Sequence, residues 1–153
     1  MQHYDLILRN ADIATVGDRY RADIGVRDGR ISAIARQLDG SSAREIDAAG
    51  RLVPPGGVGG HCHFDQPTGD GSRFSDDFFT GTRSAACGGT TTVLPFAAQQ
   101  KGGSIQDAVD DYHRRADDKA VIDYPFHLIV ADATKDVTQR ELPALIVKGY
   151  TSF

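Results

Sequence analysis

The feature that most constrains the fold is the alternation of strand-like and helix-like stretches after Pro55. These stretches follow the order β, α, β, α, β, α, β, which is typical of a parallel sheet whose strands are joined by crossover helices. A closed eight-stranded barrel of this kind needs about 250 residues, whereas the whole chain has 153. The sequence is therefore compatible with a small α/β protein or with the front portion of a barrel, and we favour the barrel.

Local signals place the boundaries of these elements. A helix is predicted to start within Ser75-Asp76-Asp77 and to end at Gly88-Gly89, because serine and aspartate cap helix starts and glycine ends helices. Apolar residues at helical spacing predict a second helix over 105–116, which Ser104 opens. The other predicted elements are strands over 90–95, 121–130 and 150–153, and a helix that starts at Thr138, has Glu141 in a capping box and ends at Gly149.

The first fifty or so residues carry a different pattern, in which apolar and polar residues alternate with a period of two. The predicted strands cover residues 4–10, 22–27, 30–35, 44–47 and 52–53. Asp28-Gly29 between two such runs is a strong signal for a hairpin turn. We therefore predict a small antiparallel layer with one buried face. The predicted domains are residues 1–53 and residues 54–153.

Two histidines, His61 and His63, lie at the predicted carboxyl end of the first strand of the alternating region. Side chains two residues apart on a strand point to the same face, so both imidazoles can reach one metal ion. Cys62 then faces the opposite side, where a free cysteine is typically a small packing residue. A His-x-His pair alone is a weak signal, because short motifs also occur by chance.

The surroundings of the pair make it more specific. Three segments resemble the dihydropyrimidinase and hydantoinase family of the amidohydrolase superfamily: His61-Cys62-His63-Phe64-Asp65-Gln66-Pro67, Gly69-Asp70-Gly71 and Gly149-Tyr150-Thr151-Ser152-Phe153. The resemblance runs from the first strands to Phe153. It implies the (β/α)8 TIM barrel of a metal-dependent hydrolase, with about three to four βα units in this chain. Strands of a small β-sandwich domain would precede the barrel.

The resemblance also implies a chemistry. Family members open cyclic amides, such as dihydropyrimidine or hydantoin rings, by attack of a metal-activated hydroxide on the ring amide carbon. His61 and His63 match the pair that binds one of two divalent metals, expected to be zinc. A carbamylated lysine that bridges the metals is expected just beyond Phe153. Phe64, Asp65 and Gln66 are expected to bind the substrate, no residue of the chain is assigned as catalytic, and the expected assembly is a homotetramer.

Two positions refine this resemblance. Dihydroorotase-like chains carry an arginine two residues after the second histidine, where this chain has Asp65, and this difference favours the dihydropyrimidinase or hydantoinase type. The family usually carries an aspartate two residues before the first histidine, where this chain has Gly59. Loss of a group that orients a metal ligand typically weakens metal binding or activity about 10- to 100-fold. The resemblance therefore predicts that Gly59→Asp would tighten metal binding.

Other histidines have simpler interpretations. His113 lies on a predicted helix away from its apolar face, which favours exposure to solvent. His127 alternates with Phe126 and Leu128, which favours a buried, hydrogen-bonded packing role over a ligand role. Two alternatives to an active enzyme stay open. The chain can be a truncated, inactive fragment, or a non-enzymatic dihydropyrimidinase-like scaffold protein, although such scaffolds lack the metal ligands.

Composition and charge exclude several classes of protein. The net charge of −4 and the lack of a basic run argue against a nucleic-acid partner. No apolar run approaches the length of a membrane span and no signal peptide is apparent, so a cytoplasmic protein is expected. With two cysteines, Cys62 and Cys87, neither a disulfide framework nor a four-cysteine zinc site is supported.

Overall fold

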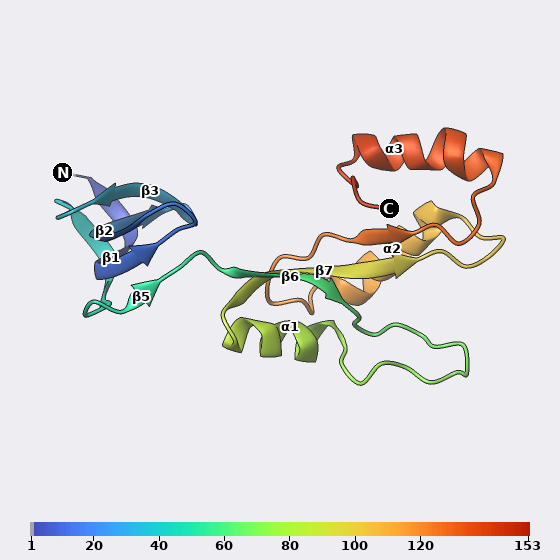
Figure 1. Ribbon diagram of the computed structural model, residues 1–153, viewed down its shortest axis with the longest axis horizontal. Helices are drawn as coiled ribbons and strands as arrows, with labels where there is room; N and C mark the ends of the chain where they lie inside the picture. The colour runs from blue at the N-terminus through green and yellow to red at the C-terminus, as the bar shows by residue number, and fades with distance from the viewer. Residues whose placement is uncertain (1) are drawn as a thin grey trace. The chain divides into compact units, whose positions relative to one another are not determined.

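The computed structural model describes residues 2–153, which belong to two compact units, Met1–Pro55 and Gly56–Phe153 (Figure 1). We call them the N-terminal unit and the C-terminal unit. None of the helices within residues 2–153 combines the length and the apolar composition needed to span a bilayer.

The N-terminal unit is built on one mixed β-sheet. Its strands are β1 His3–Ala14, β2 Arg19–Arg27, β3 Arg30–Ala35, β4 Ser41–Asp47 and β5 Leu52–Val53. The order is β3-β2-β1-β4, and β5 also pairs with β1. The first three strands are antiparallel, whereas β4 and β5 run parallel to β1. The prediction of a purely antiparallel layer is wrong, because the chain crosses from β3 at one edge of the sheet to the far side of β1.

The hairpin turn between β2 and β3 is confirmed. Asp28 and Gly29 have φ angles of 51° and 69°. Positive φ at both central residues is the type I′ pattern, whose twist matches that of the flanking strands. Glycine adopts this conformation without steric cost and aspartate tolerates it, which explains why this dipeptide marks the turn.

A charged side chain, Asp23, is buried in the N-terminal unit and fully engaged there. Its carboxylate accepts hydrogen bonds from the backbone amides of Asn10 at 2.9 Å and Leu38 at 3.1 Å, and it pairs with Arg9 at 2.9 Å. Burial alone would raise the pKa of Asp23, but these hydrogen bonds hold it below its usual value. Arg9 also pairs with Glu45 at 2.8 Å, so the network ties β1 to β2 and β4.

The C-terminal unit is a parallel sheet with helical connections, as predicted. Its strands, in the order β6-β7-β8, are β6 Gly57–Cys62, β7 Thr90–Ala98 and β8 His127–Ile129. Its helices are α1 Phe78–Cys87, α2 Ile105–Ala116, the π-helical turn η1 Val137–Glu141 and α3 Leu142–Val147. In Figure 1 the arrowheads of β6 and β7 lie at the same end of this unit, where the loops after the strands begin.

The first two predicted helix starts are confirmed by their caps. Asp77 accepts a hydrogen bond from the amide of Thr80 at 2.8 Å, and the Thr80 hydroxyl accepts one from the amide of Asp77 at 3.1 Å. The Ser104 hydroxyl accepts from the amide of Asp107 at 3.2 Å. These local signals are reliable because each satisfies amides that the helix itself leaves unpaired.

The third predicted helix starts earlier than expected, and its supposed cap has another role. The Thr134 hydroxyl accepts from the amide of Val137 at 3.2 Å, ahead of the predicted start at Thr138. Glu141 does not form a capping box there. Its carboxylate accepts instead from the Ser104 hydroxyl at 2.9 Å and from the amide of Ile105 at 2.8 Å. Glu141 therefore caps α2, a partner that local spacing cannot reveal.

Two predicted strands are shorter than expected. The run 121–130 is regular only at β8, and the rest contributes one bridge, between Thr92 and Asp123. Pro125 lies between them and has no amide proton for a ladder bond. Residues 150–153 are not a regular strand, although the Ser152 carbonyl accepts from the amide of Leu128 at 3.0 Å.

The core of the C-terminal unit lies between the sheet and its helices. Its buried members are Phe64, Phe78, Val93, Ala97, Ile105, Val109, Tyr112, Ala116, Phe126, Leu128, Val137 and Leu145. His113 joins the edge of this core, because its ring packs 5.0 Å from Phe126 and its Nε2 lies 2.6 Å from the Tyr150 hydroxyl. The predicted exposure of His113 is therefore wrong in part. Tyr124 and Phe126 both lie against the ring of His113.

Candidate metal centre

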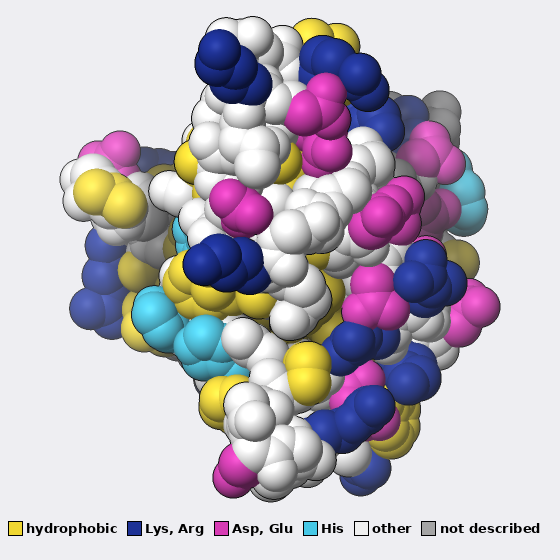
Figure 2. Space-filling model, turned by 90° about the vertical axis from the view of Figure 1, so that its right-hand side faces the viewer, with side chains coloured by type: hydrophobic (Ala, Val, Ile, Leu, Met, Phe, Trp, Pro, Cys, Tyr) yellow, Lys and Arg dark blue, Asp and Glu magenta, His cyan; other side chains and the backbone are white. Residues whose placement is uncertain are grey.

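His61 and His63 lie at the carboxyl end of β6. His61 is the penultimate residue of the strand and His63 follows its last residue. Figure 2 faces the end of the C-terminal unit toward which its strands run, and histidine side chains lie together there at the surface beside hydrophobic ones. Cys62 packs against the core on the other side of the strand, and burial raises the pKa of its thiol. Its predicted packing role is confirmed.

The two imidazole rings point their Nε2 atoms at each other. The distance between these atoms is 3.3 Å. Two nitrogens that each lie about 2.0 to 2.1 Å from one tetrahedral zinc ion are about 3.3 to 3.4 Å apart. The pair thus has the separation that a zinc ion requires of two ligands, although the same distance also admits a long hydrogen bond through a shared proton.

Phe96 of β7 forms the floor beneath the histidines. Its ring centroid lies 4.6 Å from that of His61 and 5.1 Å from that of His63. The sequence analysis did not single out Phe96, because its place beside the pair depends on the register of β7 against β6. The available signal was its alternation with the buried residues Val93, Pro95 and Ala97, which puts it on the opposite face of the strand.

The residue Gln66 contacts the second histidine. Its Oε1 lies 2.6 Å from Nδ1 of His63. An amide oxygen can only accept a hydrogen bond, so Nδ1 of His63 donates, and in the neutral ring the lone pair is left on Nε2. Partners of this kind set the tautomer of metal-binding histidines.

The other predicted substrate-binding residues have structural partners in this fold. Phe64 is buried in the core and packs edge to face on Phe78, with 5.7 Å between the ring centroids. Asp65 has a φ of 46° and its carboxylate pairs with Arg73 at 2.9 Å. These contacts shape the loop after His63, and the predicted contacts with substrate stay predictions.

The loop between residues 64 and 74 closes on itself through Asp70. The carboxylate of Asp70 accepts hydrogen bonds from the Thr68 hydroxyl, from the Ser72 hydroxyl at 2.7 Å and from the Ser72 amide at 3.0 Å. These bonds hold the pKa of Asp70 well below its usual value. The loop also bridges Pro67 to Arg73. Asp70 therefore stabilises a turn, as its residue type suggests.

His127 lies near the pair but faces other partners. Its Nε2 donates to the Gly60 carbonyl at 3.1 Å, and its Nδ1 lies 2.5 Å from the Ser152 hydroxyl. The predicted hydrogen-bonded role is confirmed, although the side chain is only partly buried. Within residues 2–153, no group of three or more His, Cys, Asp or Glu side chains is arranged to hold a metal ion. In the described part of the chain, the pair of His61 and His63 is therefore not joined by a third candidate ligand of these types.

Gly59 faces away from the pair. A Cβ atom built there would lie 3.4 Å from Cγ1 of Val93, a buried residue of the core. The ladder between β6 and β7 shifts register between Gly59 and Cys62, which interrupts the simple alternation that would put residue 59 on the face of His61.

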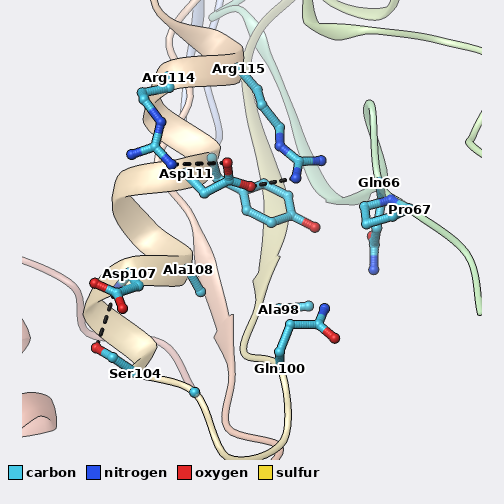
Figure 3. Close-up of a pocket in the computed structure, with 12 residues that line it drawn as sticks. Gln66, Pro67, Ala98, Gln100, Ser104, Asp107, Ala108, Asp111, Arg114 and Arg115 are labelled. Carbon is cyan, nitrogen blue, oxygen red and sulfur yellow. Dashed lines mark hydrogen bonds and ion pairs between the residues drawn. The ribbon is translucent and has the colours of Figure 1, made fainter.

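Two cavities adjoin the candidate site. One of about 560 Å³ is lined by His61, Phe96 and His127 together with Gly60, Leu128, Ile129, Val130, Ser152 and Phe153. The other, of about 340 Å³, lies between Gln66 and Pro67 of the loop and the polar side chains of α2, where Asp111 pairs with Arg114 and Arg115 (Figure 3). Both volumes are in the range of small-molecule sites.

These features define a class: an α/β protein whose paired histidines, at the carboxyl end of a parallel strand, form a candidate metal centre beside a cavity.

No family model matches the chain. It is 46% identical over 148 residues to a D-hydantoinase of Geobacillus stearothermophilus, which covers 96% of this chain and 31% of that protein. It is 36% identical over 153 residues to a dihydropyrimidinase of Rattus norvegicus, which covers 97% of this chain and 29% of that protein.

The solved structures agree. A D-hydantoinase structure superposes with a TM-score of 0.91 at 42% identity, over 97% of this chain and 32% of that one. The chain belongs to the dihydropyrimidinase and hydantoinase family. It spans about a third of the length of the curated relatives that it matches.

Proposed function

We propose that this chain supplies the histidine pair of a metal-dependent hydrolase that opens cyclic amides of the dihydropyrimidine or hydantoin type. The observation that carries the proposal is the 3.3 Å separation of the Nε2 atoms of His61 and His63 at the carboxyl end of β6. In barrel enzymes the chemistry takes place at this end of the strands. Family membership supplies the substrate class, since the relatives are named hydantoinases and dihydropyrimidinases.

The proposed fold is the start of a (β/α)8 barrel, with β6, β7 and β8 as its first strands and the N-terminal sheet as part of a small β-sandwich domain. The parallel order of these strands and the structural similarity to D-hydantoinase support it. A homotetramer, by family resemblance, and a cytoplasmic location, from the sequence of the N-terminus, complete the proposal.

In the proposed site, His61 and His63 bind the metal through Nε2, and the chain positions both rings. Zinc, when bound, lowers the pKa of a water molecule toward 7 and polarises the amide carbonyl. Phe96 packs against both histidine rings and also lines the cavity beside His61. Gln66 holds the proton on Nδ1 of His63. The cavity of about 560 Å³ beside His61 offers room for a small cyclic amide.

Two alternatives differ from this proposal in what they predict. A non-enzymatic scaffold would not need the histidine pair, so the geometry of His61 and His63 disfavours it. An inactive fragment is consistent with the finding that, within residues 2–153, no group of three or more His, Cys, Asp or Glu side chains is arranged to hold a metal ion. A lone ion on two ligands lacks a positioned base to accept a proton from water.

Joining this chain to the downstream part of a D-hydantoinase tests the proposal. We expect the joined protein to hydrolyse hydantoin or dihydrouracil in the presence of zinc, and to lose that activity in the His61→Ala/His63→Ala double variant. We expect no hydrolysis by the 153-residue chain alone. Zinc-dependent turnover by the chain alone, or full activity of the double variant, would contradict the proposal.

A further inference from the structure

We propose that Gln66 is a positioning residue, which fixes the ring of His63 in the orientation and tautomer that aim its Nε2 lone pair at the point faced by His61. The inference rests on the proposed metal-binding function of the pair and adds a residue that selects the metal-binding form of one ligand. It differs from the substrate-binding role that the resemblance predicts for Gln66.

The first step concerns the plane of the His63 ring. This ring is nearly parallel to the rings of Phe74 and Phe96, with interplanar angles of 22° and 18° and centroid distances of 5.3 Å and 5.1 Å. Stacking of this kind restricts the tilt of the ring, but a 180° flip leaves the plane unchanged. The phenylalanines therefore set the plane of His63 without choosing which edge faces His61.

The second step concerns that choice. A flip of the His63 ring would put carbon atoms where its two nitrogens now lie. Nδ1 of His63 would then no longer face Gln66, and Nε2 of His63 would no longer face His61. The hydrogen bond from Nδ1 to Gln66 Oε1, at 2.6 Å, is lost in the flipped ring. When the proton moves to Nε2, the contact through Oε1 is also lost, because an amide oxygen cannot donate, and the amide would have to turn its NH2 group toward Nδ1. With its oxygen toward the ring, Gln66 thus selects both the orientation and the tautomer.

The third step explains why Gln66 can do this from a loop. The main chain around it is held on several sides. Asp65 donates its amide proton to the Asp76 carbonyl at 2.8 Å, and its own carbonyl accepts from Arg115 at 2.7 Å. The carbonyl of Gln66 accepts from the amide of Phe74 at 3.3 Å. The loop is therefore anchored to α2 and to the segment of residues 74–76 that follows it, which limits the positions open to the Gln66 side chain.

The test uses the 153-residue chain with ¹⁵N-labelled histidine, free of metal and at a pH above the usual histidine pKa of about 6.5. Side-chain ¹⁵N shifts report the tautomer of each histidine. We expect His63 to carry its proton on Nδ1, Gln66→Met to move the proton largely to Nε2, and Gln66→Glu to restore the Nδ1 form because a carboxylate also accepts. The matched control is Gln100→Met, which changes a glutamine of the 340 Å³ cavity outside the pair and should leave His63 unchanged.

Zinc titration of the same variants completes the test. We expect Gln66→Met to weaken zinc binding about 10-fold, as is typical when a partner of a metal ligand is lost, and Gln66→Glu to keep it. An unchanged tautomer and an unchanged zinc affinity in Gln66→Met would overturn the role of Gln66 and leave the proposed metal function standing. Equal zinc uptake by the wild type and the His61→Ala/His63→Ala variant would overturn the metal function itself, a result that the Gln66 variants cannot mimic.

Discussion

The polar clusters of the two units differ in how their hydrogen-bonding groups are used. In the N-terminal unit, Asp23 meets Arg9 and two backbone amides, so its carboxylate is surrounded by donors of this chain. In the C-terminal unit, the Nε2 atoms of His61 and His63 face each other across 3.3 Å at the surface. The first cluster is complete without a ligand, whereas the second brings two ring nitrogens together with no other group of the described residues between them.

This difference separates a structural polar cluster from a candidate binding site. A buried carboxylate with several donors stabilises the strands that carry those donors, and removing it leaves the donors unpaired. Two imidazole nitrogens that converge gain most from a cation or a proton between them. We therefore expect substitutions in the first cluster to change stability and substitutions in the second to change metal binding.

The largest effect on stability is expected from Asp23→Ala. Removing the carboxylate leaves the amides of Asn10 and Leu38 without their acceptor, while Arg9 keeps its pair with Glu45. We expect this loss to cost about 3 kcal/mol. Thermal or urea unfolding of the variant measures this cost. Zinc binding by the C-terminal unit should be unchanged, and loss of zinc binding in Asp23→Ala would break the distinction between the two clusters. Asp12→Ala, which removes the exposed pair with Arg19, is the matched control and should have a much smaller effect.

A smaller destabilisation is expected from Gly81→Ala in the C-terminal unit. A Cβ atom at this position would lie 2.2 Å from the ring of Phe64, so α1 or the loop after His63 must shift. Overpacking of this kind costs about 2 kcal/mol, which unfolding measurements can detect. Gly69→Ala is the control, since a Cβ atom there meets nothing within 4 Å. Equal stability of the two variants would contradict the close packing of Phe64 on α1.

Acid should weaken the N-terminal unit through Asp23. Because hydrogen bonds and Arg9 hold the pKa of Asp23 below its usual value in the folded chain, its contribution to stability is present above the unfolded pKa of about 3.9 and is lost as the pH falls through the folded value. We expect Asp23→Asn to show a weaker loss of stability on acidification than the wild type. The free energy of unfolding of both proteins is measured as a function of pH. An equal loss of stability on acidification in the wild type and in Asp23→Asn would contradict this role.

The smallest effect is expected from Gly59→Asp, on which the resemblance and the structure disagree. The resemblance predicts tighter metal binding. The structure puts the Cβ atom of residue 59 against Val93 and away from the pair, so we expect zinc affinity to change by less than about 10-fold, the lower bound for a true ligand partner. Zinc titration decides between them, and a larger gain in affinity would show that an acid at this position reaches His61.

Features that depend on neighbouring residues could be predicted from the sequence, whereas features that depend on residues far apart in the chain could not. Helix α2 and the hairpin at Asp28 were predictable, because caps, turn residues and apolar spacing act over a few residues. The direction of β4 and the capping of α2 by Glu141 were not, because they depend on segments far apart in the chain. The site divides in the same way. Alternation along β6 predicted a shared face for His61 and His63, whereas the position of Phe96 needed the register of a second strand.

The most direct test of the central claim is a zinc titration of the 153-residue chain by calorimetry. We predict one zinc ion per chain bound through His61 and His63, with binding abolished in the His61→Ala/His63→Ala variant. His127→Ala is the matched control and should keep the zinc, because His127 bonds to Gly60 and Ser152 instead. Undiminished zinc binding in the double variant, or its loss only in His127→Ala, would contradict the assignment of the pair as the metal centre.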